Sequence, residues 1–387
     1  MKKTLKWIAL ALVALQVMLL LVACTKPAAT EAAAPAKTEA AAPAEKPAEP
    51  AKTEEQPAEP AKAVEQPAPT EAPKAEEPAE PEAPAEEHYP VTISTYNYAK
   101  EPVEVTFEKC PQRVVCTNQT QTELLLYFGL DEYIMGTAYL DGEIRDDLKP
   151  QYEALKAAGK ELTVKGYPAK ETVLALEPDF IFGWRSAFAE DQLGDVSEWH
   201  KMGVGTMILR CSNNTAPVRD LEAVLADIVD IGKIFNIEEK TNAYIEETRA
   251  LMARIAEKVG TLEAPYRAII IEPYGGTFYC WGEKTLTGAL VVAAGATYAL
   301  PDGGDLSVED IVNINPDVII VDYMDEEGIT PEESKAKAIA SVMDEAALAE
   351  VPAVKNGKVM AINLTDVYGG GVRMVPSVEA MFSFMYE

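Results

Sequence analysis

Two twelve-residue stretches of this chain repeat one pattern. The first reads ETVLALEPDFIF from Glu171, and the second reads EDIVNINPDVII from Glu309. Each opens with Glu, reaches Pro-Asp at its eighth and ninth positions and ends in an apolar run. Each stretch therefore predicts a short helix that Pro ends, followed by a buried strand. A chain that repeats this unit is constrained to contain two similarly built α/β parts.

The residues around each repeat alternate between strand and helix patterns. QRVVCT, DFIFGW and GTMILRC are β-rich runs of the first half, and YRAIIIEPY, DVIIVDY and GKVMAINL are those of the second half. Helical stretches separate most of them, and the segment GGTFYCWGEK after YRAIIIEPY is expected to be a loop. Strands that alternate with helices predict parallel sheets covered on both faces. We therefore expect two Rossmann-like α/β lobes.

Two consecutive helical stretches join the halves. Apolar residues recur at three- and four-residue spacing over residues 217–235, and residues 238–259 contain neither Gly nor Pro. A helix of the second length spans roughly 30 Å, which is enough to bridge two lobes. We therefore assign residues 88–215 to an N-terminal lobe, 216–260 to a helical connector and 261–387 to a C-terminal lobe.

The amino terminus has the pattern of an export signal. Lysines precede an apolar run over residues 8–22, and LVAC follows, with Cys24 as its last residue. This pattern predicts a signal peptide over residues 1–23, and the run is shorter than the ~20 residues that a membrane span needs. LVAC resembles the lipobox of bacterial lipoproteins, which implies that Cys24 is lipidated and that lipid alone attaches the protein to the membrane.

Residues 24–87 are predicted to be a lipid-anchored, disordered linker. They consist almost wholly of Ala, Pro, Glu, Lys, Thr and Gln, so they offer little apolar surface to offset the entropy of ordering the backbone. The whole chain carries a formal net charge of −29, which argues against nucleic acid as a partner. The cysteines beyond Cys24 match no zinc-binding spacing, and both disulfides and free buried thiols are compatible with them.

Candidate ligand-binding residues follow the predicted strands, because ligands of parallel sheets lie beyond the carboxyl ends of the strands. Thr117, Asn118 and Gln119 follow the first strand. The candidates for ligand contact are aromatic residues and arginines: Tyr139, Trp184, Arg185, Arg210, Tyr274, Tyr279, Trp281, Tyr368 and Arg373. Arginines pair with carboxylates or chelate oxygens, and rings give contact area at low entropic cost. The set predicts a bulky, flat or multiply oxygenated ligand with anionic character.

The sequence favours binding over catalysis. It has no Gly-x-Ser-x-Gly elbow, no P-loop, no dinucleotide fingerprint and no His-Glu-x-x-His. His88 ends the linker and His200 lies in a helix where we expect it to be solvated, so neither a metal site nor His-ligated haem is expected. Haem bound through a tyrosine such as Tyr368 stays open. A stalked surface adhesion protein would explain the linker but not the repeated stretches.

The combination of motifs resembles the periplasmic and lipoprotein binding proteins for iron-siderophores, haem and cobalamin. The likeness lies in CPQRVVCTNQTQTELLLYFGLDEYIMGTA and in ETVLALEPDFIFGWR. It implies two α/β lobes joined by one rigid helix, a ligand cleft between the lobes and no cofactor. It also implies a monomer on the extracytoplasmic face of the membrane, at the cell surface or in the periplasm. The implied partners are the permease dimer of an ABC importer and a metal chelate, of which a ferric-siderophore ranks before a corrinoid and haem.

The resemblance also gives the repeated Glu a role. In that family one surface Glu on each lobe docks into arginines of the permease, and the matching residues here are Glu171 and Glu309. A permease with two like subunits presents two like basic pockets, and carboxylate–arginine pairs are directional. The alternative is that each Glu only complements the dipole of its helix.

Overall fold

The structure, a computed structural model, describes residues 88–387. The predicted signal peptide (1–23), the predicted lipidation site Cys24 and the predicted linker (24–87) lie outside the described residues. Within residues 88–387, no helix combines the length and the apolar character needed to cross a membrane.

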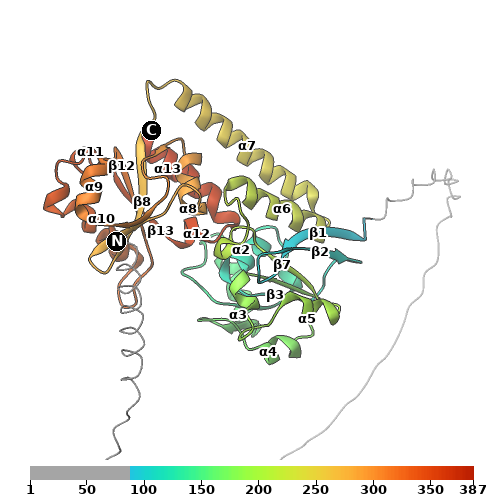
Figure 1. Cartoon of the computed structure of the whole chain (residues 1–387). Coiled ribbons are helices and arrows are strands. Elements are labelled where there is room, and N and C mark those ends of the chain that lie inside the picture. The colour runs from blue at the N-terminus through green and yellow to red at the C-terminus, as the bar shows by residue number, and fades with distance from the viewer. Residues whose placement is uncertain (1–87) are drawn as a thin grey trace, which may run out of the picture. The chain divides into compact units, whose positions relative to one another are not determined.

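The N-terminal lobe contains a five-stranded parallel sheet (Figure 1). Its strand order is β5-β4-β3-β6-β7, so the chain leaves the central strand β3 first to one side and then to the other. The strands are β3 (Val114–Cys116), β4 (Ile134–Ala138), β5 (Glu161–Thr163), β6 (Phe180–Gly183) and β7 (Gly205–Ile208). The helices are α2 (Gln119–Tyr127), α3 (Lys149–Ala157), α4 (Lys170–Ala175) and α5 (Val196–Lys201). This order is the doubly wound arrangement, which places a ligand site beside the central strand.

An antiparallel hairpin precedes this sheet, and the sequence analysis did not anticipate it. Its strands are β1 (Val91–Tyr96) and β2 (Pro102–Phe107). Thr95 joins the hairpin to β7, because its hydroxyl accepts a hydrogen bond of 2.9 Å from the main-chain N–H of Ile208. Phe107 packs edge-on against Phe180 of β6 at 5.2 Å. The hairpin therefore covers one end of the parallel sheet.

The C-terminal lobe contains a mixed sheet of order β11-β9-β8-β12-β13, with β10 paired to β8. Strands β8, β12 and β13 are parallel, whereas β9 and β11 add antiparallel pairs. The strands are β8 (Arg267–Tyr274), β9 (Thr277–Cys280), β10 (Thr297–Tyr298), β11 (Gly304–Leu306), β12 (Val318–Tyr323) and β13 (Val359–Asn363). The helices are α8 (Leu286–Ala293), α9 (Val308–Ile314), α10 (Pro331–Met343), α11 (Pro352–Lys355), α12 (Thr365–Tyr368) and α13 (Met374–Tyr386). Short 3₁₀ turns are η1 (Asp131–Tyr133), η2 (Arg185–Phe188), η3 (Ser212–Asn214), η4 (Ala346–Leu348) and η5 (Gly371–Arg373).

The expected loop after Tyr274 is wrong in part, because β8 and β9 form an antiparallel hairpin there. Gly275 and Gly276 form its turn with φ values of 57° and 85°. Positive φ at both central residues suits the twist of a two-residue hairpin, and Gly adopts it without steric cost. The alternating burial of β9 then turns Phe278 and Cys280 to the core.

The two repeated stretches form equivalent units, as the sequence predicts. In each lobe a short helix, α4 or α9, leads into an inner strand, β6 or β12. Val173 and Ile311 occupy the third position of each repeat, and both are fully buried. The prediction of two α/β lobes is confirmed, with the qualification that the second sheet is mixed.

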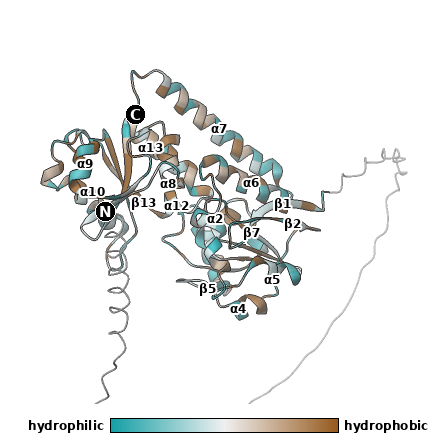
Figure 2. Ribbon diagram, in the orientation of Figure 1, coloured by the Kyte–Doolittle hydropathy of each residue, from teal (hydrophilic) through white to brown (hydrophobic). Residues whose placement is uncertain are grey.

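Helices α6 (Leu221–Phe235) and α7 (Glu238–Gly260) fall within the residues assigned to the connector. Figure 1 shows α7 as the long helix that runs from the N-terminal lobe toward the C-terminal lobe. Hydrophobic and hydrophilic residues both occur along this helix (Figure 2), and its buried face packs on α6 and α13. A 23-residue helix of this kind is a stiff spacer.

Four cysteines lie within the described residues, and all four are free thiols: Cys110, Cys116, Cys211 and Cys280. The alternative of disulfides among them is therefore not realised in this structure. The expectation that His200 is solvated is wrong in part. Its ring is half-buried and lies 2.8 Å from the hydroxyl of Thr206 on β7.

Candidate functional site

A cavity lies where the carboxyl ends of both sheets meet. Its volume is about 200 Å³. Tyr139 follows β4 and Trp184 follows β6 in the N-terminal lobe, while Tyr368 and Arg373 come from the segment after β13 in the C-terminal lobe. The structure therefore brings four of the nine predicted ligand residues together. The remaining lining residues are Gln119, Thr120, Glu123, Asp141, Met324, Leu364, Thr365 and Gly369.

Aromatic rings form a continuous series at this cavity. The ring centroids of Trp184 and Tyr368 are 5.6 Å apart, although the residues belong to different lobes. Trp281 also packs on Tyr368, at 5.5 Å, and Tyr279 meets Trp281 edge-on at 5.2 Å. Such tilted and edge-on pairs are favourable arrangements of aromatic rings. Trp281 and Tyr279 therefore continue the aromatic series beyond the residues that line the cavity.

Trp281 is oriented by a buried carboxyl group on β12. Its indole N–H donates a hydrogen bond of 3.0 Å to Oδ1 of Asp322, a fully buried residue whose Oδ2 has no partner in the described part of the chain. Burial, with a smaller contribution from the charge of Glu272, raises the pKa of Asp322 to about 8. Burial also raises the pKa of Glu272. Asp322 is thus an acid that is mainly neutral near pH 7.

The approach of the two lobes depends on Gly369. A Cβ atom at this position would lie 2.4 Å from the hydroxyl oxygen of Thr120 on α2 and 3.2 Å from the ring of Trp184. Only a residue without a side chain lets the main chain of the C-terminal lobe come this close to the cavity wall of the N-terminal lobe.

The start of α2 organises the N-terminal side of the cavity. Asn118 caps the helix, because its side chain accepts a hydrogen bond from the N–H of Thr120, and its amide group donates to Asp141 at 2.8 Å. Gln119 accepts hydrogen bonds of 2.9 Å from the N–H groups of Asp141 and Gly142. Burial raises the pKa of Asp141, while the bond from Asn118 and the charge of Arg373 oppose the change. These bonds hold the loop after β4 against the cavity.

Arg373 is not available as a free cation. Its Nε and Nη2 donate to the two carboxylate oxygens of Glu123 at 2.6 Å each, across the boundary between the lobes. Its remaining N–H groups face Asp366 at 2.6 Å, the carbonyl of Glu143 at 2.6 Å and the hydroxyl of Thr365 at 3.5 Å. Burial opposes the charge of Arg373, but Glu123 and Asp366 outweigh burial and raise the pKa of the guanidinium group. Glu123 itself is 1% exposed.

The other two predicted arginines lie elsewhere. Arg210 donates to Asp227 at 2.6 Å and to Asp230 at 2.7 Å, two buried acids of α6. Arg185 donates to the carbonyl of Tyr98, and its guanidinium carbon lies 5.1 Å from the centroid of that ring. Neither residue lines the cavity. The expected cluster of arginines for an anionic ligand is therefore not assembled there.

Tyr274 also lies away from the cavity, at the β8–β9 turn, where it is 75% exposed. Arg113, which directly precedes β3, donates to the carbonyls of Leu176 and Glu177 after α4.

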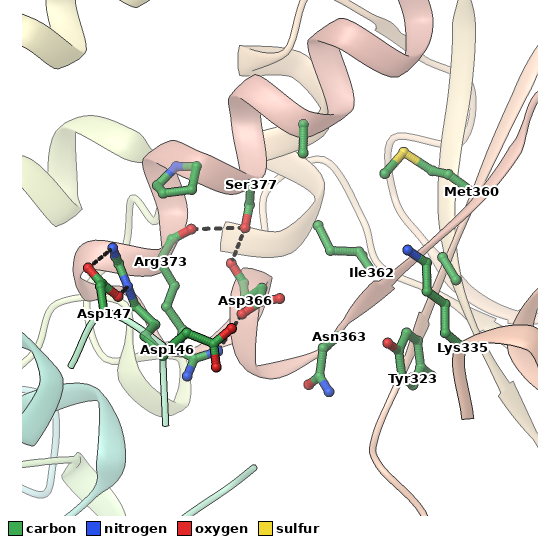
Figure 3. A pocket seen from close by; sticks show the side chains of 14 residues that line it. Asp146, Asp147, Tyr323, Lys335, Met360, Ile362, Asn363, Asp366, Arg373 and Ser377 are labelled. Carbon is green, nitrogen blue, oxygen red and sulfur yellow. Dashed lines mark hydrogen bonds and ion pairs between the residues drawn. The ribbon is translucent and has the colours of Figure 1, made fainter. Parts of the chain in front are cut away.

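Arg373 also lines a second and wider pocket of about 480 Å³ (Figure 3). Asp146 and Asp147 reach it from the N-terminal lobe, whereas Tyr323 and Lys335 come from β12 and α10. The hydroxyl of Ser377 on α13 donates to the carbonyl groups of Asp366 and Arg373, as Figure 3 shows. This pocket has no aromatic series like that of the smaller cavity, so we regard the smaller cavity as the candidate ligand site. Among residues 88–387, no group of three or more His, Cys, Asp or Glu side chains is arranged to hold a metal ion.

Sequence reasoning did not select Glu123 as a site residue. One signal could have found it: Glu123 is the charged residue of the helix sequence QTQTELLLY, one turn after Gln119. Two side chains four residues apart share a helix face. Gln119 was already expected at the carboxyl end of a strand, so its partner on the same face was a candidate.

The repeated Glu residues lie on the surface and do not line the cavity. Glu171 on α4 and Glu309 on α9 are exposed, and neither makes an ion pair with another described residue. On α9 the cap is made by the neighbouring Asp310, which accepts hydrogen bonds from Ser307 at 2.6 and 2.8 Å. These bonds lower the pKa of Asp310. Glu309 therefore remains free for a partner.

Each repeated Glu has an exposed aliphatic residue one helical turn further on. Leu174 and Val312 occupy this position, and each is 40% exposed. Residues three apart lie on the same face of a helix. Both lobes thus present an acid beside an apolar side chain at corresponding places.

Comparison with known proteins decides the family. The family model described as "Periplasmic binding protein" matches residues 114–363, which include both sheets and the connector. The chain belongs to the periplasmic binding protein family. Its members bind ligands for transport outside the cytoplasm and are neither enzymes nor users of cofactors. The expectation of a substrate-binding protein of this kind is confirmed.

Individual relatives share the fold of this periplasmic binding protein at low identity. The uncharacterized ABC transporter substrate-binding lipoprotein YvrC of Bacillus subtilis (strain 168) is 22% identical over 307 residues, which cover 78% of this chain and 87% of the relative. A periplasmic binding protein from Veillonella parvula superposes with a TM-score of 0.67 at 23% identity, over 77% of this chain and 98% of that chain. The catecholate-siderophore binding protein VctP from Vibrio cholerae superposes with a TM-score of 0.59 at 20% identity, over 76% of this chain and 99% of that chain.

Proposed function

We propose that this periplasmic binding protein captures a siderophore-type metal chelate in the cavity between its lobes and delivers it to the permease of an ABC importer. The observation that carries the proposal is the aromatic series at the cavity, in which Trp184 and Tyr368 face each other from different lobes. Flat rings offer large contact area to an organic chelate at low entropic cost. The name of the siderophore-binding relative from Vibrio cholerae supports the same class of cargo.

A panel of ferric-siderophores, corrinoids and haem tests the cargo. We expect a ferric-siderophore to raise the melting temperature of the purified protein and to quench its tryptophan fluorescence. Trp184→Ala should abolish both effects, whereas Tyr274→Ala, which removes a mostly exposed ring at the hairpin turn, should abolish neither. A response to a corrinoid or to haem alone would replace the siderophore by that ligand.

We further propose that Glu171 and Glu309 dock into two basic pockets of a dimeric permease. Their exposure and their lack of an ion pair within the described residues support this role over a purely capping role. Leu174 and Val312 would contact apolar surface beside each basic pocket. The protein would act as a monomer, since two like sites on one chain match two like subunits.

Lipidation of Cys24 would hold the protein at the membrane, with residues 24–87 as a tether. The motif LVAC supports this proposal. Cys24→Ala should prevent the incorporation of labelled fatty acid, and labelling of the variant at its amino terminus would contradict the proposal.

A further inference from the structure

The charge of the cavity is set by one contact between the lobes. Among residues 88–387, Arg373 is the only basic residue that lines the cavity, and Glu123 and Asp141 are its acidic lining residues. All five N–H groups of the Arg373 guanidinium face oxygen atoms of the protein, and Glu123 takes two of them with bonds of 2.6 Å. The cavity therefore has an excess of acid, and Glu123, Asp366 and the carbonyl of Glu143 hold the guanidinium group of Arg373 with bonds of 2.6 Å, so that only the N–H at 3.5 Å from Thr365 is weakly bonded.

We propose that Glu123 determines ligand specificity by occupying Arg373, so that the cavity accepts a chelate without net negative charge and rejects a polyanionic one. The inference rests on the proposed function and narrows its cargo. A ferric ion bound by three singly charged hydroxamates is electrically neutral, whereas the same ion bound by three doubly charged catecholates is a trianion. The preferred class is thus the ferric trihydroxamate.

If Arg373 left Glu123 to bind an anionic ligand, the rearrangement would be energetically unfavourable. An anionic ligand could reach the guanidinium group only if Glu123, which is 1% exposed, lost its cationic partner and kept only the hydrogen bonds from the side-chain amide of Gln119 and the main-chain N–H of Arg145. A buried charge without a counter-charge is strongly unfavourable. Asp141 would also remain beside the ligand and Asp366 beside Arg373, and like charges in close contact repel.

Other arginines do not offset the excess of acidic residues at the cavity. Arg210 is held by Asp227 and Asp230, and Arg145 donates to Asp147 and to the carbonyl of Val372. Neither of them lines the cavity.

The test compares two ferric chelates of opposite class. Ferrichrome, a neutral trihydroxamate, and ferric enterobactin, a tricatecholate trianion, are titrated into the purified mature protein while tryptophan fluorescence is recorded at low salt. We expect ferrichrome to bind at least about tenfold more tightly. Glu123→Gln keeps the size of the side chain and frees the charge of Arg373, so the ratio of the two affinities should move toward the trianion by about tenfold or more.

A second variant protects the test from a folding defect. Asp141→Asn removes one negative charge but leaves the pair of Glu123 and Arg373 intact, and it should move the ratio in the same direction. Glu239→Gln, an equal change of charge at an exposed position of α7, should leave the ratio unchanged. A purely structural role of Glu123 would weaken both chelates alike and would not change their ratio.

The outcomes separate the inference from the proposed function. Tighter binding of the trianion by the unmodified protein would overturn the charge preference while the chelate function stands. An unchanged ratio in both variants would overturn the assignment of Glu123 and Asp141. Binding of neither chelate would overturn the siderophore cargo and the charge preference together.

Discussion

Neighbouring acids on α9 give a sharp test of docking, because the structure assigns them different tasks. Glu309 is exposed without an ion pair in the described part of the chain, whereas Asp310 closes the capping box with Ser307. Glu309→Ala should therefore impair transport with little effect on stability. Asp310→Ala should lower the melting temperature and leave docking intact once the protein is folded.

The expected losses of stability and of permease binding follow from the exposure and the contacts of these acids. Removing a Glu from the first turn of a helix costs about 0.3–1 kcal/mol through the helix dipole. In a protein of this size, a loss of that order shifts the melting temperature by at most about 4 °C. Truncating one partner of a desolvated charge pair costs about 2–5 kcal/mol, so each lost docking Glu should weaken permease binding by about 30-fold to a few thousandfold.

The assay is uptake of labelled ligand into proteoliposomes that contain the permease, at equal amounts of binding protein. Each single variant, Glu171→Ala or Glu309→Ala, should retain part of the uptake, and the double variant should lose it while ligand affinity stays normal. Added salt should weaken docking of the unmodified protein. Normal uptake by the double variant, or a loss of stability in Glu309→Ala equal to that in Asp310→Ala, would refute the reasoning.

Further predictions concern the structure around the cavity. Arg210→Ala leaves Asp227 and Asp230 buried without their cation, so urea unfolding should show a loss of about 3–5 kcal/mol, and a loss below about 1 kcal/mol would contradict the buried ion pair. Asp322 has a pKa of about 8 in the folded protein and 3.8 as its ordinary value, so the folded state binds more protons between these pH values and its stability should fall as pH rises from about 4 to 8. Asp322→Asn keeps an acceptor for Trp281 and should remove this part of the pH dependence. Urea unfolding of both proteins at pH 5 and pH 8 measures it, and a difference in unfolding free energy between the variant and the unmodified protein that is equal at both pH values would contradict the prediction. Gly369→Ala should destabilise the protein by about 1–3 kcal/mol through contact with Thr120, and Thr120→Ala should relieve part of that cost in a double-mutant cycle.

The sequence was sufficient to predict the two lobes, because their strands and helices leave periodic patterns within short windows. The repeated helix-to-strand unit identified α4 with β6 and α9 with β12. Strand ends also identified Trp184 and Tyr139 as cavity residues, since the carboxyl edge of a parallel sheet is fixed by chain direction. The ligand roles of these residues stay predictions.

The pairing of charges was beyond such reasoning. Glu123 and Arg373 are 250 positions apart, and no local pattern indicates which acid meets which arginine across two lobes. Arg210 was selected because it follows a strand, yet two acids of α6 hold it. Strands β1, β2 and β9 were missed for another reason. Their residues alternate between buried and exposed, so their apolar signal is weaker than that of a mostly buried strand such as β12.

The free thiols have a consequence for how the protein matures. Burial raises the pKa of Cys116 to about 12 and that of Cys280 to about 11, so these thiols stay protonated and unreactive at neutral pH. No bond between cysteines has to form before residues 88–387 reach their native state. Residues 88–387 therefore need no oxidant or disulfide isomerase to fold, and their stability does not depend on a disulfide. Such a binding protein suits an anoxic exterior as well as an aerobic one.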